Sequence, residues 1–90
     1  MPQVKFTSHL RRFFPGLHQT EVTGKTVAEV ICALDSHYPG LAGYLVDDQG
    51  ALRQQVNIFV GDSLIRDRRR LQDSVAPEDH LIVFQVLSGS

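Results

Sequence analysis

The chain has 90 residues, of which 42% are hydrophobic, and a formal net charge of −1. This length predicts one domain, and the hydrophobic fraction argues against disorder. The near-neutral charge gives no electrostatic case for binding nucleic acid or an anionic membrane. No apolar run approaches the ~18 residues of a membrane span, and the first residues lack the pattern of a signal peptide. The single cysteine, Cys32, excludes an internal disulfide and fits a reducing compartment, so we expect a cytoplasmic domain.

The first quarter of the chain predicts two strands. Val4 and Phe6 alternate with polar neighbours, which is typical of a half-buried strand. Pro15 and Gly16 break this pattern, because proline fixes φ and glycine relaxes it. Residues 18–23 then predict a second strand. Since the two strands are close in sequence, we expect them to pair as an antiparallel hairpin.

A helix is predicted next. Thr26 and Glu29 have the spacing of a capping box, in which the hydroxyl and the carboxylate satisfy early backbone N–H groups. Pro39 ends the helix, since the residue before a proline avoids the helical region. Residues 41–46 are a candidate for a second, short helix. Four apolar residues recur at i, i+3, i+4 and i+7 on one helical face: Val27, Val30, Ile31 and Leu34.

The second half of the chain predicts three more strands. Residues 56–60 form a strand signal, Gly61 and the residue after it suit a two-residue turn, and 63–66 predict a short return strand. Residues 67–70 predict a solvated loop. The nearly continuous apolar run 81–87 predicts a last strand, either central or buried on both faces. One helix would cover one face of this sheet and leave the other to water or to a partner.

Five features in this order carry a resemblance: "TVAEVICAL" after the second strand, "YPGL" after the helix, "VNIFVGD" as third strand and turn, "LQDSVAPEDHLIVF" before the end, and a small tail. Together they resemble a ubiquitin-like β-grasp domain, and more narrowly the MoaD/ThiS family of sulfur carriers. The resemblance implies an α+β fold, a mixed sheet of about five strands with one main crossover helix on one face. The domain would span residues 1–87, and 88–90 would be a flexible tail.

The resemblance also implies a function for the tail, which is Ser88, Gly89 and Ser90. In the family, a ubiquitin-activating-type enzyme uses ATP to adenylate the C-terminal carboxylate, and sulfur then replaces the adenylate to give a thiocarboxylate. The carrier delivers this sulfur in biosynthesis of the molybdopterin or thiamine type, in some cases to a synthase large subunit. Such a carrier binds no cofactor and is a protein co-substrate, not an enzyme.

The terminal residue departs from the family pattern, which ends in Gly-Gly. Here Ser90 follows Gly89, and its hydroxymethyl group in a tight channel would cost on the order of 1–3 kcal/mol. Three interpretations stay open. The carboxylate of Ser90 is activated as it stands, a protease trims Ser90 to expose Gly89, or the protein is an interaction module that transfers nothing.

Two surfaces are candidates for partner docking. By analogy with ubiquitin-like domains, Ile82 and Phe84 point outward from the last strand with Phe59 beside them, although Gln85 on the supposed core face argues against this register. The arginine cluster at Arg66 and 68–70 is either a solvated loop or a docking patch for an acidic partner surface.

The sequence predicts no catalytic or metal site. Cys32 lies inside the predicted helix as a buried or half-buried structural thiol, with no histidine or aspartate placed to activate it. No paired carboxylates, nucleophile–base set or phosphate-binding loop is visible. The four histidines lack the spacing of metal ligands: His9, His18, His37 and His80.

Overall fold

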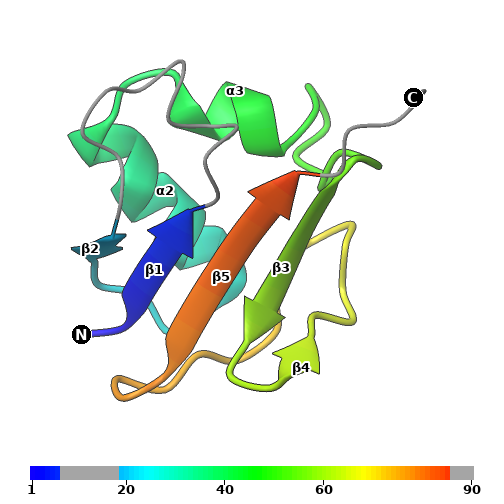
Figure 1. Ribbon diagram of the computed structural model, residues 1–90. Coiled ribbons are helices and arrows are strands. Elements are labelled where there is room, and N and C mark those ends of the chain that lie inside the picture. The colour runs from blue at the N-terminus through cyan, green and yellow to red at the C-terminus, as the bar shows by residue number, and fades with distance from the viewer. Residues whose placement is uncertain (7–18, 86–90) are drawn as a thin grey trace.

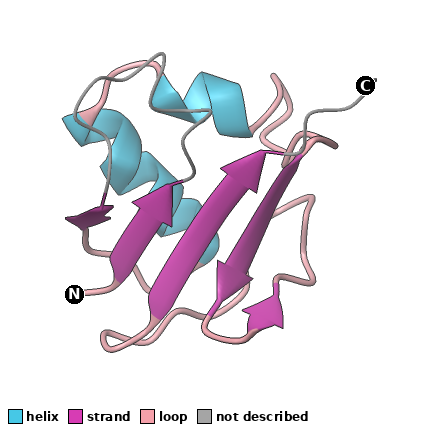
Figure 2. Ribbon diagram, in the orientation of Figure 1, coloured by secondary structure: helices cyan, strands magenta, loops and turns pink. Residues whose placement is uncertain are grey.

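The computed structural model describes residues 1–6 and 19–85. Within these residues, five strands form one sheet, and two helices lie on one face of it (Figure 1, Figure 2). This arrangement confirms the predicted α+β class and mixed sheet. The elements in chain order are β1 (Gln3–Phe6), β2 (Gln19–Glu21), α2 (Val27–His37), α3 (Leu41–Leu45), β3 (Val56–Val60), β4 (Ser63–Leu64) and β5 (His80–Gln85).

The last strand is the centre of the sheet. The strand order is β2-β1-β5-β3-β4, with β5 parallel to β1 and antiparallel to β3. The predicted hairpin is confirmed, because β1 and β2 pair antiparallel with Val4 opposite Thr20. The central position of β5 explains its apolar run, since it is flanked by strands on both sides. The predicted boundary between domain and tail, at residues 87 and 88, lies outside the described residues.

Local signals account for the start of α2. The Thr26 hydroxyl accepts a hydrogen bond from the Glu29 N–H at 3.2 Å, as the capping box predicts. The Glu29 carboxylate reaches back to the N–H of Lys25 at 3.1 Å, one residue before the cap. Gly24 lets the preceding turn pack directly on the helix, because a Cβ there would lie 2.8 Å from both Val30 Cγ2 and the Val30 nitrogen.

The core lies between the helices and the inner face of the sheet. The predicted apolar face of α2 is fully buried against residues such as Val4, Ile58, Leu81 and Val83. Each such side chain contributes roughly 1.5–3 kcal/mol by leaving water. No residue in the described part of the chain is both buried and polar.

Two strands are shorter than predicted. β4 ends at Leu64 instead of residue 66, because Ile65 is buried and Asp73 accepts hydrogen bonds from the next two backbone N–H groups. These bonds lead the chain away from β3. β2 covers 19–21 of the predicted 18–23. After β2, the Val22 N–H donates a hydrogen bond to the Pro2 carbonyl, which lies before β1. Residue 18 is outside the described residues.

Candidate partner-binding face and tail base

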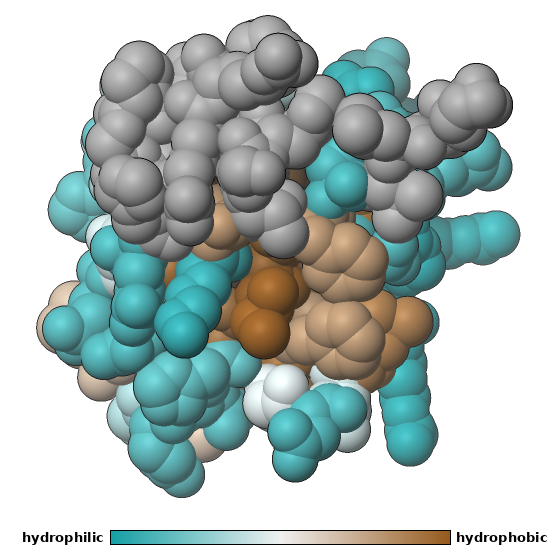
Figure 3. Space-filling view, viewed as in Figure 1, coloured by the Kyte–Doolittle hydropathy of each residue, from teal (hydrophilic) through white to brown (hydrophobic). Residues whose placement is uncertain are grey.

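The face of the sheet opposite the helices carries an apolar patch. On β5, Leu81 and Val83 are buried while Ile82 between them is 40% exposed, so the strand presents Ile82 and Phe84 to the outer side. Phe59 lies directly opposite Ile82 on β3. Figure 3 shows the resulting brown surface in the middle of this face. The structure therefore brings Phe59, Ile82 and Phe84 together on one exposed face, as the sequence predicted.

The two aromatic rings of this face stack on each other. The ring centroids of Phe59 and Phe84 are 5.6 Å apart and their planes differ by 18°. Such a pair is stabilised beyond its area burial and forms a rigid apolar platform. Gln85 on the core face argued against this register, but Gln85 is the last residue of β5. There it is half-buried opposite Val56, so its polar end can reach water from the helix side.

Leu64 enlarges this surface and was missed from the sequence. It lies opposite Phe59 in the β3–β4 pair, so its side chain is on the same side of the sheet, and it is 46% exposed. The short turn at Gly61 sets this register, and that turn was the signal that could have identified Leu64. We call Phe59, Leu64, Ile82 and Phe84 the outer patch. Contiguous exposed apolar side chains on a small domain mark interaction sites.

The base of the tail is braced by Arg68. Its guanidinium donates hydrogen bonds of 2.8 Å to Asn57 Oδ1 and to the carbonyls of Arg53 and Val56. Val56 is the β3 partner of Gln85, so this brace lies beside the last described residue of β5. The tail residues Ser88, Gly89 and Ser90 themselves lie outside the described residues.

The prediction of a solvated loop at 67–70 is therefore wrong for Arg68. Beyond the two residues of β4, the edge of β3 has carbonyl groups that need donors, and the flat guanidinium supplies several donors from one side chain. Arg69 and Arg70 are exposed, in agreement with the prediction.

Two carboxylates fix the backbone of this arginine loop. Asp67 Oδ1 accepts from the N–H groups of Arg69 and Arg70, and the Asp73 carboxylate accepts from the N–H groups of Arg66 and Asp67. The hydrogen bond from the Arg70 N–H, followed by those from Gln72 and Arg69, holds the pKa of Asp67 below its ordinary value of 3.8. Both acids are thus engaged with backbone amides.

Cys32 is exposed on α2, so the expectation of a buried or half-buried thiol is wrong. Its neighbour Ile31 belongs to the buried stripe, and the next position, about 100° further round the helix, points out of the core. A shallow hollow of about 410 Å³ includes this side chain together with Gly24, Ala28 and Glu29. Among residues 1–6 and 19–85, no group of three histidine, cysteine or acidic residues could hold a metal ion.

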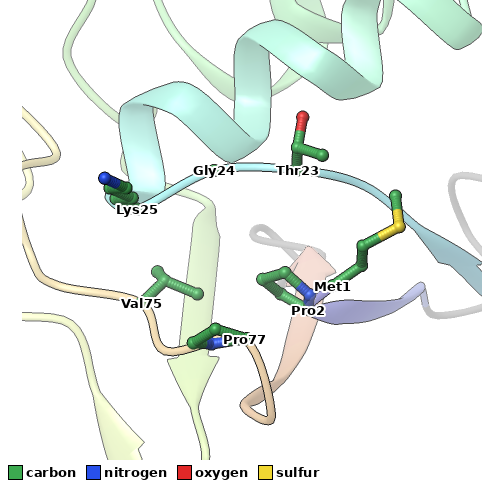
Figure 4. Close-up of a pocket in the computed structure, with 7 residues that line it drawn as sticks. All are labelled: Met1, Pro2, Thr23, Gly24, Lys25, Val75 and Pro77. Carbon is green, nitrogen blue, oxygen red and sulfur yellow. The ribbon is translucent and has the colours of Figure 1, made fainter.

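A second hollow, of about 480 Å³, lies at the end of the domain where β1 begins (Figure 4). Pro2, Val75 and Pro77 line it, and Lys25 brings the only charged side chain of its lining. This set contains no cysteine, histidine or carboxylate side chain that could act as a base for Thr23 or Lys25. Of the helices that the structure describes, none has the length and apolar character to cross a membrane.

The sequence model of the ThiS family matches residues 4–89, which is nearly the whole chain. The chain belongs to the ThiS family. The match extends from β1 through β5 and includes the outer patch and the arginine loop. The predicted membership of the MoaD/ThiS group of sulfur carriers is confirmed.

Curated relatives and solved structures agree with this membership. The sulfur carrier protein CysO of Mycobacterium tuberculosis and that of Mycobacterium bovis are 28% identical over 88 residues, which cover 96% of this chain and 95% of each relative. The crystal structure of M. tuberculosis CysO superposes with a TM-score of 0.85 at 27% identity, covering 97% of this chain and 100% of that chain. A chain of the Amycolatopsis orientalis BexX/CysO complex gives 0.87 at 26%, with full coverage of both chains.

More distant structures share the fold alone. The small archaeal modifier protein SAMP1 of Haloferax volcanii has a TM-score of 0.77 at 23% identity, with 99% of this chain and 98% of that chain covered. The ubiquitin-like β-grasp fold predicted from the sequence is therefore confirmed.

Proposed function

We propose that this ThiS-family protein carries sulfur as a thiocarboxylate on its C-terminal carboxyl group. A ubiquitin-activating-type enzyme would use ATP to adenylate that carboxyl group, which in the present sequence belongs to Ser90. The match of the family over residues 4–89, together with full-length likeness to proteins named sulfur carriers, is the observation that carries the proposal. An exposed cysteine without a disulfide partner supports a reducing, cytoplasmic location.

The proposed reaction needs no catalytic residue from this chain. A carboxylate oxygen attacks the α-phosphorus of ATP, and pyrophosphate leaves. Hydrosulfide then attacks the acyl carbon, AMP leaves, and a thiocarboxylate remains. Its sulfur displaces a leaving group from an electrophilic carbon of the acceptor, and hydrolysis of the resulting thioester leaves a thiol on the acceptor and restores the carboxylate. The protein is thus a co-substrate that contributes a fixed strand, β5, and a surface for its partners.

The acceptor is proposed at the level of its class, a small metabolite into which one sulfur atom is inserted. Acceptors of the molybdopterin or thiamine type belong to this class, and a synthase large subunit would then be a second partner. The relatives with the fullest coverage carry the name CysO, so we do not choose one of these branches.

The test is intact-mass spectrometry after incubation with the activating enzyme of the same genome, ATP and sulfide. The expected result is a mass gain that corresponds to sulfur replacing oxygen. Two variants locate the acceptor carboxylate, one with Ser90 removed and one with Ser90→Gly. If Ser90→Gly gains sulfur and the wild type does not, the family mechanism survives but the Ser90 terminus is disabled. The mass of the protein isolated from its own cells then decides whether Ser90 is trimmed to expose Gly89. If neither they nor the wild type gain an adenylate or sulfur, the sulfur-carrier proposal fails.

The exposed outer patch favours one alternative, a β-grasp module that binds a protein and transfers nothing. Under this alternative, removal of residues 88–90 leaves partner affinity nearly unchanged, while Phe84→Asp or Phe59→Asp abolishes binding. Under the carrier proposal, the same truncation abolishes sulfur loading. A binding measurement and a mass measurement on the truncated protein therefore separate the two.

A further inference from the structure

Positive charge borders the outer patch on both sides. On β1, Lys5 is exposed and lies opposite Ile82. On the other side, the Arg68 guanidinium bonds Asn57, whose β5 partner is Phe84. Arg66 adds a further charge close to this border, since it is exposed and follows Leu64 by two residues. Figure 3 shows hydrophilic surface on both sides of the brown patch.

This charge is not neutralised by neighbouring acids. Of the carboxylates near Arg66 in the chain, Asp67 and Asp73 accept hydrogen bonds from backbone N–H groups, and Asp62 lies four residues before Arg66 in the exposed β3–β4 turn. In the described strands, Glu21 is the only acidic residue on the outer face, and it lies on the edge strand β2, opposite Gln3. The net charge of −1 is therefore unevenly distributed, with Lys5 on one side of the outer patch and Arg66 and Arg68 near the other.

We propose that the outer patch binds a folded protein whose contact surface is an apolar hollow bordered by carboxylates, and that Lys5 and Arg66 select this partner by charge. The inference rests on the proposed function, since the partner it names is the activating enzyme. The apolar residues supply affinity when they leave water, whereas the flanking cations act mainly on the rate and selectivity of association.

The same charges argue against a second copy of this chain as the occupant. In a two-fold symmetric dimer the same face meets itself, so the cationic borders on β1 and beside β4 would lie against cationic borders. Like charges placed together across an interface disfavour the pairing. A partner with carboxylates around its contact surface would instead attract the cations of this face.

The experiment measures association and dissociation rates between the wild-type protein and the purified activating enzyme at low and high salt. The test variant is the double charge reversal Lys5→Glu with Arg66→Glu. We expect its association rate to fall on the order of tenfold or more at low salt and to approach that of the wild type at high salt, with little change in the dissociation rate. The control, Lys25→Glu, reverses a single cation at the hollow whose lining contains no residue of the outer patch, and it should bind like the wild type.

The outcomes separate this inference from the carrier proposal. If the double variant associates as fast as the wild type at low salt while the wild type gains sulfur, the charge selection is wrong and the carrier function stands. If binding depends on the two cations but no adenylate or thiocarboxylate forms, the surface inference stands and the carrier function fails. Absence of binding by the wild type, or dimerisation through Ile82 seen by sedimentation, overturns the inference.

Discussion

The brace made by Arg68 leads to a prediction about stability. Replacement of Arg68 by Met keeps much of the aliphatic stem but removes three hydrogen bonds of 2.8 Å, to Asn57 Oδ1 and to the carbonyls of Arg53 and Val56. With about 1 kcal/mol net for each bond, the free energy of unfolding should fall by about 3 kcal/mol. In a domain of this size, such a loss lowers Tm by roughly 12–24 °C.

The assay is urea denaturation followed by circular dichroism, with a thermal scan as a second readout. Arg69→Met is the matched control, since that side chain is exposed on the same loop, and it should change the free energy by less than about 0.5 kcal/mol. Arg68→Lys keeps the charge but cannot reach all three acceptors, so its cost should be intermediate. Equal stability of Arg68→Met and Arg69→Met would refute the assignment of Arg68 as a brace.

Three further predictions follow from other contacts. Gly24→Ala should destabilise the protein by about 1–3 kcal/mol in urea melts, because the new Cβ meets Val30, whereas Gly43→Ala, with open space around it, should not. Asp67→Asn should destabilise the protein at pH 7, because a lowered folded pKa gives stability that is fully present above the ordinary value of 3.8. The effect should shrink as the pH falls from 3.8 through the lower folded pKa, and equal effects at pH 7 and below the folded pKa would contradict this. Ile82→Asp should leave the midpoint of urea unfolding almost unchanged and abolish binding to the activating enzyme, and retained binding would exclude the outer patch as the docking surface.

The parts of the fold that were predictable depend on local signals. The helix follows from the Thr26 and Glu29 cap and the apolar spacing after it, and the outward position of Ile82 follows from period-two alternation along β5. The resemblance supplied the topology, since strand order depends on contacts that no local pattern specifies.

The features that were missed depend on contacts distant in sequence. Arg68 lies in a run of arginines, and nothing local distinguishes it from Arg69; the difference is the uncovered edge of β3, which exists because β4 is only two residues long. The exposure of Leu64 likewise follows from its pairing with Phe59, and so from the register of a turn and not from its own neighbours. The role of a side chain that binds to or packs on a strand distant in sequence can be predicted only after the position of that strand is known.

The position of β5 also sets how the domain responds to mechanical load. Under the proposed function, a partner that draws on the C-terminal end would load β5, the strand flanked by β1 and β3. The hydrogen bonds of both ladders run across the axis of β5, so a pull along it loads them in shear and they resist together. An edge strand pulled sideways would instead unzip one bond at a time. The fold is therefore suited to having its end pulled without losing its structure, which a carrier that docks and releases repeatedly requires.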